Sequence, residues 1–140
     1  MRVIVDTNVL VSGPISEAGA PARIVDAVLR GEIIPVMSAA TRAELEEVLS
    51  RPRLKMFFRR AGVTPQRLLA DLERVAQFVR PKPVRMAIRD EKDRPFLEIA
   101  AAKPAPDFII TGDKDFERDR YAGVPVISAS LFVATMLRQA

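Results

Sequence analysis

Four acidic side chains, spread over most of the chain, stand where a folded protein could bring them together: Asp6, Glu44, Asp93 and Asp113. Two of them follow short apolar runs that are typical of buried strands. The other two border the first apolar positions of segments with helical spacing. Carboxylates that approach one another raise each other's pKa unless a cation neutralises them. A cluster of these four acids would therefore favour a site for Mg²⁺ or Mn²⁺.

The 140-residue chain contains no cysteine and no histidine. The lack of cysteine excludes disulfides, thiolate metal sites and a cysteine nucleophile. The lack of histidine excludes a Ser-His-Asp triad, imidazole acid–base pairs and the usual zinc ligands. Any enzymatic chemistry must then use carboxylates, hydroxyls, lysine or arginine. Carboxylates acting with a hard divalent cation are the hypothesis that this composition favours.

Each acid also has a simpler structural interpretation. Asp6 opens the run Asp-Thr-Asn, which is good turn chemistry. Glu44 is expected in the first turn of a helix, where it would interact with the helix dipole. Asp93 stands two residues before Pro95, where it would make a good N-cap. Considered one at a time, the acids do not distinguish these roles from catalytic ones.

The order of apolar runs predicts alternating strands and helices in a single domain over residues 1–140. Strands are expected at 3–5, 33–37, 107–110 and 124–127, with a short edge strand at 84–88. Helices are expected to begin near Pro21, Ser38 or Thr41, Thr64, Pro95 and Ser128, and residues 9–20 to form a connection. This alternation predicts a parallel α/β sheet. The carboxyl ends of its strands would gather the four acids on one rim.

Composition places the protein among globular, water-exposed domains. Apolar residues make up 49 % of the chain, and no apolar run is long enough to span a bilayer. Asp6 and Asn8 interrupt the first apolar stretch where a signal peptide would continue, so we expect a cytoplasmic protein. The formal net charge of +4 permits a polyanionic partner.

A basic and partly aromatic segment covers residues 51–60. Its side chains could contact a phosphate backbone. The interpretation that we favour from the sequence is a solvated helix with three residues packed inward: Leu54, Phe57 and Phe58.

The chain resembles the PIN domain family of ribonucleases, in particular its small bacterial single-domain (VapC-like) members, regarded as toxins of toxin–antitoxin pairs. The resemblance is carried by the opening run 3–10 with its Asp-Thr-Asn, by Glu44-Leu45, by residues 93–100, and by the closing run 109–116 with its Thr-Gly-Asp-Lys-Asp-Phe. These motifs keep their order across nearly the whole chain. The resemblance implies a three-layer α/β/α sandwich around a central parallel sheet of about five strands.

The resemblance also implies metal-dependent cleavage of RNA phosphodiesters, with Mg²⁺ or Mn²⁺ as cofactor. It makes Asp6 and Asp93 the main metal ligands, with Asp113 beside them, and Glu44 the residue that completes the acidic pocket. It gives supporting roles to four further residues, as orienting groups or auxiliary acids: Asn8, Thr111, Asp115 and, more weakly, Glu98.

The partners that the resemblance implies are an RNA substrate, a small antitoxin protein and a second copy of the chain in a homodimer. Two other functions compete with this hypothesis. An Asp after a buried strand also serves aspartyl-phosphate phosphatases as nucleophile, but these usually carry a second Asp where this chain has Asn8. A PIN-like fold could also bind RNA or protein without catalysis.

Overall fold

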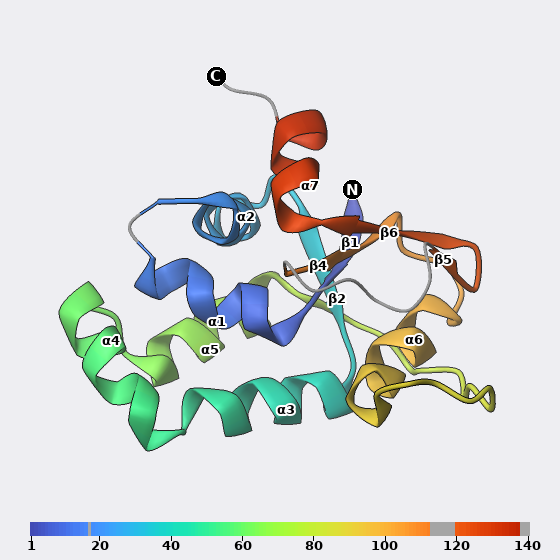
Figure 1. Ribbon diagram of the computed structural model, residues 1–140, viewed down its shortest axis with the longest axis horizontal. Helices are drawn as coiled ribbons and strands as arrows, with labels where there is room; N and C mark the ends of the chain where they lie inside the picture. The colour runs from blue at the N-terminus through green and yellow to red at the C-terminus, as the bar shows by residue number, and fades with distance from the viewer. Residues whose placement is uncertain (17, 113–119, 138–140) are drawn as a thin grey trace.

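The computed structural model describes residues 1–16, 18–112 and 120–137. Its strands are β1 (Arg2–Val5), β2 (Ile34–Met37), β3 (Gln77–Phe78), β4 (Phe108–Thr111), β5 (Arg120–Tyr121) and β6 (Val124–Ser128). They form one sheet in the order β3-β2-β1-β4-β6-β5, drawn in Figure 1. All neighbours pair in parallel except β5, which pairs antiparallel with β6 at one edge. The predicted parallel sheet of about five strands is confirmed, with β5 added.

Helices cover both faces of the sheet (Figure 1). They are α1 (Thr7–Ile15), α2 (Ala20–Leu29), α3 (Ala39–Leu49), α4 (Lys55–Ala61), α5 (Pro65–Val75), α6 (Arg94–Ala100) and α7 (Ala129–Met136), with short 3₁₀ turns η1 (Pro52–Leu54) and η2 (Glu91–Asp93). The predicted three-layer α/β/α sandwich is therefore confirmed. No helix within the described ranges is both long and apolar enough to cross a membrane.

The central strands separate two hydrophobic cores. Side chains alternate between the faces of a strand, so Val3 and Val5 enter the core under α1, α2 and α7, whereas Ile4 enters the core under α6. β1 lies in the middle of the sheet, where Ile4 pairs with Ile109 and Val5 with Ile110. Because both faces are covered, residues 3–5 of β1 and 108–110 of β4 are all apolar.

Polar side chains set the beginnings of several helices, as the sequence predicts. Ser38 is the N-cap of α3: its hydroxyl accepts from the Thr41 N–H (3.2 Å), and its own N–H donates to the Thr41 hydroxyl (2.9 Å). Both residues named as alternative caps thus take part in one capping box. Thr64 and Ser128 cap α5 and α7 in the same way, each through its side-chain oxygen.

The prediction of a connection over residues 9–20 is wrong for its first half, because α1 occupies Thr7–Ile15. This helix is buried on most of its surface and shows no amphipathic stripe, so the usual periodicity is absent. Gly13 permits its close packing, since a Cβ there would lie 2.5 Å from Cγ2 of Val25 in α2. Pro14 is tolerated near the end of the helix.

The predicted edge strand at 84–88 is also wrong. The backbone of this segment is held by side chains of α6 instead of a neighbouring strand. The Val84 N–H donates to the Glu98 carboxylate (3.3 Å), and the guanidinium of Arg94 donates to the carbonyls of Val84 and Met86. The strand that does pair with β2 is the short β3, directly after α5.

Candidate functional site

Asp6 lies at the carboxyl end of β1. Its N–H donates to the Ile110 carbonyl (2.9 Å), which extends the pairing of β1 with β4 by one hydrogen bond. Its carboxylate caps α1 by accepting from the Asn8 N–H (3.2 Å). Burial raises the pKa of Asp6, and the N–H groups of Asn8, Gly112 and Thr7 oppose that effect. Asp6 therefore has a structural role, but it caps a helix and not the turn predicted from the sequence. Its half-buried carboxylate faces the rim of the sheet.

Glu44 is tied to the start of α1. The hydroxyl of Thr7 donates to Oε2 of Glu44 at 2.6 Å, a bond between residues 37 positions apart in the sequence. Because α3 begins at Ala39, Glu44 lies in its second turn and not in the first, so the predicted helix-dipole role is wrong. Thr7, which is 5 % exposed, is a site residue that the sequence analysis missed.

Asp93 ends η2 immediately before α6, yet its side chain forms no capping hydrogen bond. The capping interpretation of Asp93 is therefore not supported. Its pKa is raised to about 6, first by burial and then by the negative charges of Asp90, Asp6 and Glu44, with Arg89 opposing. Asp93 consequently experiences the charges of two other predicted site acids, from β1 and from α3.

One cleft of about 560 Å³ collects these groups. Its walls carry Asp6, Glu44 and Asp93 together with Asn8, and cationic side chains line it as well: Arg51, Arg53, Arg89 and Lys92. Among the described residues, no three carboxylates lie close enough together to hold one metal ion in common. Asp113 and Asp115 lie outside the described residues. The structure thus brings three of the four predicted acids to one cleft.

Two further predicted residues, Thr111 and Glu98, do not line this cleft. Thr111 is buried at the end of β4, and its hydroxyl donates to the carbonyl of Gly112 (3.1 Å), whose N–H lowers the pKa of Asp6. Glu98 uses its carboxylate to bind the Val84 N–H. The orienting role of Thr111 stays a prediction.

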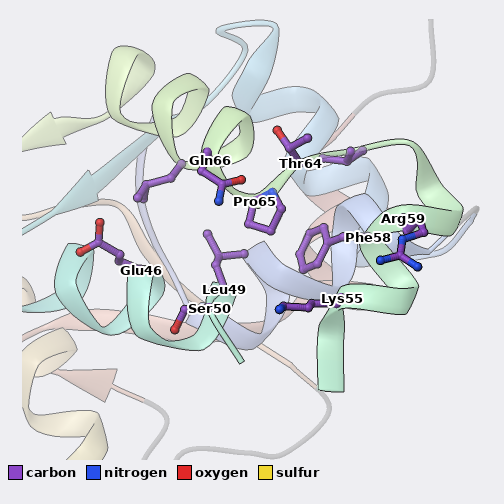
Figure 2. A pocket seen from close by; sticks show the side chains of 11 residues that line it. Glu46, Leu49, Ser50, Lys55, Phe58, Arg59, Thr64, Pro65 and Gln66 are labelled. Atoms are coloured by element: carbon purple, nitrogen blue, oxygen red, sulfur yellow. The ribbon is translucent and has the colours of Figure 1, made fainter. Parts of the chain in front are cut away.

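Figure 2 shows a different and more apolar hollow, of about 550 Å³, between α3, α4 and α5. Leu49, Phe58 and Pro65 point into it, with Lys55 and Arg59 beside them. None of the predicted site acids lines this hollow. This hollow therefore belongs to a different part of the surface from the acidic cleft.

The basic segment differs in one respect from the expectation of an inward-packed helix. Phe58 is buried, as predicted, and Leu54 is partly buried, but Phe57 is 49 % exposed. The α4 helix therefore presents an aromatic ring to solvent among its cations.

Fold and cleft define an α/β domain with carboxylates gathered at the carboxyl edge of a parallel sheet. Residues 2–115 match the family model of the PIN domain. The chain belongs to the PIN domain family, which is generally of nuclease type and generally depends on divalent metal ions. This confirms the family resemblance read from the sequence motifs.

The chain is also similar to an uncharacterized protein of Methanocaldococcus jannaschii. The two are 29 % identical over 115 residues, which cover 82 % of this chain and 72 % of the relative. No solved structure matches the chain significantly.

In the metal-free protein we expect the Asp93 carboxyl to titrate near pH 6, measurable by carbon NMR of the side chain. Its pKa in the folded state lies above the ordinary value of 3.8, so the folded state binds the proton more tightly. Stability should therefore fall as the pH rises from about 4 to about 6.

Asp93→Asn should flatten this pH dependence and raise the free energy of unfolding at neutral pH by about 1 kcal/mol, allowing for partial solvent screening. Urea unfolding across this pH range measures both effects. Asp26→Asn, which removes an exposed acid of α2, is the matched control and should leave the profile unchanged. A pKa near 4 for Asp93 would contradict the prediction.

Proposed function

We propose that the protein is a metal-dependent endoribonuclease that hydrolyses RNA phosphodiesters in the cleft of Asp6, Glu44 and Asp93. One observation carries this proposal beyond family membership: the three acids come from distant parts of the chain and line one cleft. Burial raises the pKa of Asp93 there, and the charges of Asp6 and Glu44 add to that effect. Bringing like charges together destabilises a fold. A function that uses them explains why the chain tolerates that cost.

The donor set fits a hard divalent cation. Carboxylate oxygens are the ligands that Mg²⁺ and Mn²⁺ prefer, and neither histidine nor cysteine is present to favour a softer metal. In the proposed site Asp6 and Asp93 hold the ion, Glu44 completes the pocket, and Asp113 and Asp115 are further acids. Bound there, Mg²⁺ or Mn²⁺ would lower the pKa of a water and neutralise charge that develops on the phosphate.

The side chains of the protein supply position and charge around that centre. Thr7 fixes the carboxylate of Glu44 through its short hydrogen bond. The N–H groups near Asp6 favour the ionised form of its carboxylate against the opposing effect of burial. Cationic side chains of the same cleft, such as Lys92 and Arg53, would attract the phosphates that flank the cleaved bond. Attack by water would leave a 5′-phosphate and a 3′-hydroxyl.

A non-catalytic binding module is the second candidate. It is favoured by the finding that no three acids of the described residues are close enough for a shared metal ion. A real metal site stabilises the folded state on binding. An increase in melting temperature with Mn²⁺ or Mg²⁺ therefore favours the nuclease, and its absence favours the binding module.

Metal-stripped protein should cut a mixed single-stranded RNA only after Mg²⁺ or Mn²⁺ is restored. Asp6→Asn should lower this cleavage by at least about a hundredfold, because it removes a charged ligand while the amide oxygen can still cap α1. The cleavage rate is measured on denaturing gels beside the folded fraction of each protein.

Asp26→Asn is the control for a lost surface carboxylate and should cut RNA like the wild type. Full activity of a folded Asp6→Asn protein would refute the proposed site. Metal binding without cleavage of any RNA would support the non-catalytic alternative.

Thr7 is proposed as a positioning residue for Glu44. Thr7→Val should lower kcat by about ten- to a hundredfold with little change in KM, because the hydroxyl bond to the carboxylate is lost. Thr7→Ser keeps the hydroxyl and should restore most of the activity. Equal losses in the two variants would indicate that Thr7 matters through packing alone.

The resemblance to toxin components supports the further proposal that a small antitoxin and a second copy of the chain are partners. Induced production of the protein in a bacterial host should then slow growth, because cellular RNA is cleaved, and Asp6→Asn should relieve the effect. Growth curves test the toxin role, and the sedimentation of the purified protein tests whether it forms a dimer. An active nuclease that leaves growth unchanged would argue against the toxin role.

A further inference from the structure

The segment 53–60 carries charge that the fold does not neutralise. Four cations lie on it: Arg53, Lys55, Arg59 and Arg60. All four are exposed, and none forms an ion pair with a residue in the described ranges. Between them, Met56 is 57 % and Phe57 is 49 % exposed. An exposed aromatic ring flanked by solvated cations is the combination that binds flat, anionic groups through stacking and charge.

Three adjoining hollows connect the acidic cleft with Phe57. The acidic cleft shares Arg51 and Arg53 with a second hollow of about 550 Å³, which also reaches Ile15 near the end of α1. Ile15 in turn lines a third hollow, also of about 550 Å³, together with Phe57 and Arg60. We call these three hollows the α1 track.

The α1 helix forms one wall of the whole track. Its first residues, Thr7 and Asn8, line the acidic cleft, and its last residues, Pro14 and Ile15, line the hollow at Phe57. Figure 1 shows α1 leaving the end of β1 and running toward α4. At 1.5 Å per residue its nine residues span about 13 Å. That length matches roughly four stacked nucleotides at 3.4 Å each.

We propose that the α1 track binds the single-stranded RNA beside the cleaved bond, with Arg53 and Arg60 contacting phosphates and Phe57 stacking on a base. The proposal rests on the ribonuclease function proposed above and names the form of its substrate. A paired base is already stacked in its helix and cannot lie on Phe57, so the track selects unpaired RNA over duplex.

Charge favours RNA over a protein as the occupant. Arg60 lines the same hollow as Phe57, and Arg53 lines the hollow that adjoins it. The segment 53–60 contains no acid that could pair with cations of a second copy. Cations combined with aromatic faces are the usual means of binding single strands. The experiment must distinguish RNA binding by Phe57 from a protein contact through the same ring.

The test measures RNA binding in the presence of a metal chelator, so that no metal-dependent cleavage takes place. A fluorescein-labelled, uridine-rich RNA of about 12 nucleotides, within the usual range of single-strand site sizes, is titrated with each protein. Phe57→Ala should weaken binding by between about 5- and about 150-fold, the range found for loss of one base stack. Phe57→Trp should restore it, and a blunt duplex of the same sequence should bind Phe57→Ala and wild type equally.

The salt dependence separates the charged contacts from the aromatic one. Arg53→Gln and Arg60→Gln should each make the slope of log K against log salt shallower by about 0.7, whereas Phe57→Ala should leave it unchanged. Arg80→Gln removes an exposed cation that lines none of the three hollows and is the matched control. Phe78→Ala removes a ring of β3 that is 47 % exposed and is the control for Phe57.

Equal affinities of Phe57→Ala and Phe78→Ala for the single-stranded RNA would refute the proposal that the α1 track binds RNA. So would a change in sedimentation of Phe57→Ala without a change in RNA binding, because Phe57 would then be a protein contact. Because the binding assay needs neither metal nor cleavage, a result that refutes the α1 track does not refute the proposed nuclease activity. Conversely, Phe57-dependent binding by a protein that never cuts RNA would refute only the catalytic function.

Discussion

A buried strand that ends in a carboxylate is the constraint on which this site depends. Residues 3–5 are at most 5 % exposed and have parallel neighbours on both sides. Asp6 adds one more hydrogen bond to Ile110 and then caps α1, so its backbone cannot move without disrupting sheet and helix together. The position of α1, and through Thr7 that of Glu44, follows from this junction.

The acids of the cleft destabilise the folded protein. Burial raises the pKa of Asp6, and backbone N–H groups oppose that effect. Burial, followed by the charges of Asp90, Asp6 and Glu44, raises the pKa of Asp93. No lysine or arginine forms an ion pair with either acid among the described residues. Arg51 and Arg53 line the cleft at the start of α1, and Arg60 lies with Phe57 at its other end. A polyanion held with a divalent cation would satisfy both ends.

Local sequence determined most of the framework and part of the site. The β-branched run before Asp6 predicts a buried strand because such side chains fit a pleated sheet covered on both faces. Ser38 and Thr41 predict the start of α3 because capping is chemistry between near neighbours. Alternation of strands and helices then places strand ends and helix starts on one rim, which is why Asp6, Glu44 and Asp93 could be named together before their positions were known.

Only the tertiary structure decided what depends on contacts between distant segments. The sequence does not mark α1 as a helix, because it is buried almost all round and has no apolar stripe. It does not pair Thr7 with Glu44, since that bond joins residues 37 positions apart. It does not distinguish Phe57 from Phe58 as the exposed ring, because the packing partner is decided elsewhere in the chain. Propensity and capping are local properties, whereas burial is set by the whole fold. The sequence therefore named the candidate acids, and the fold decided that Asp6, Glu44 and Asp93 line one cleft.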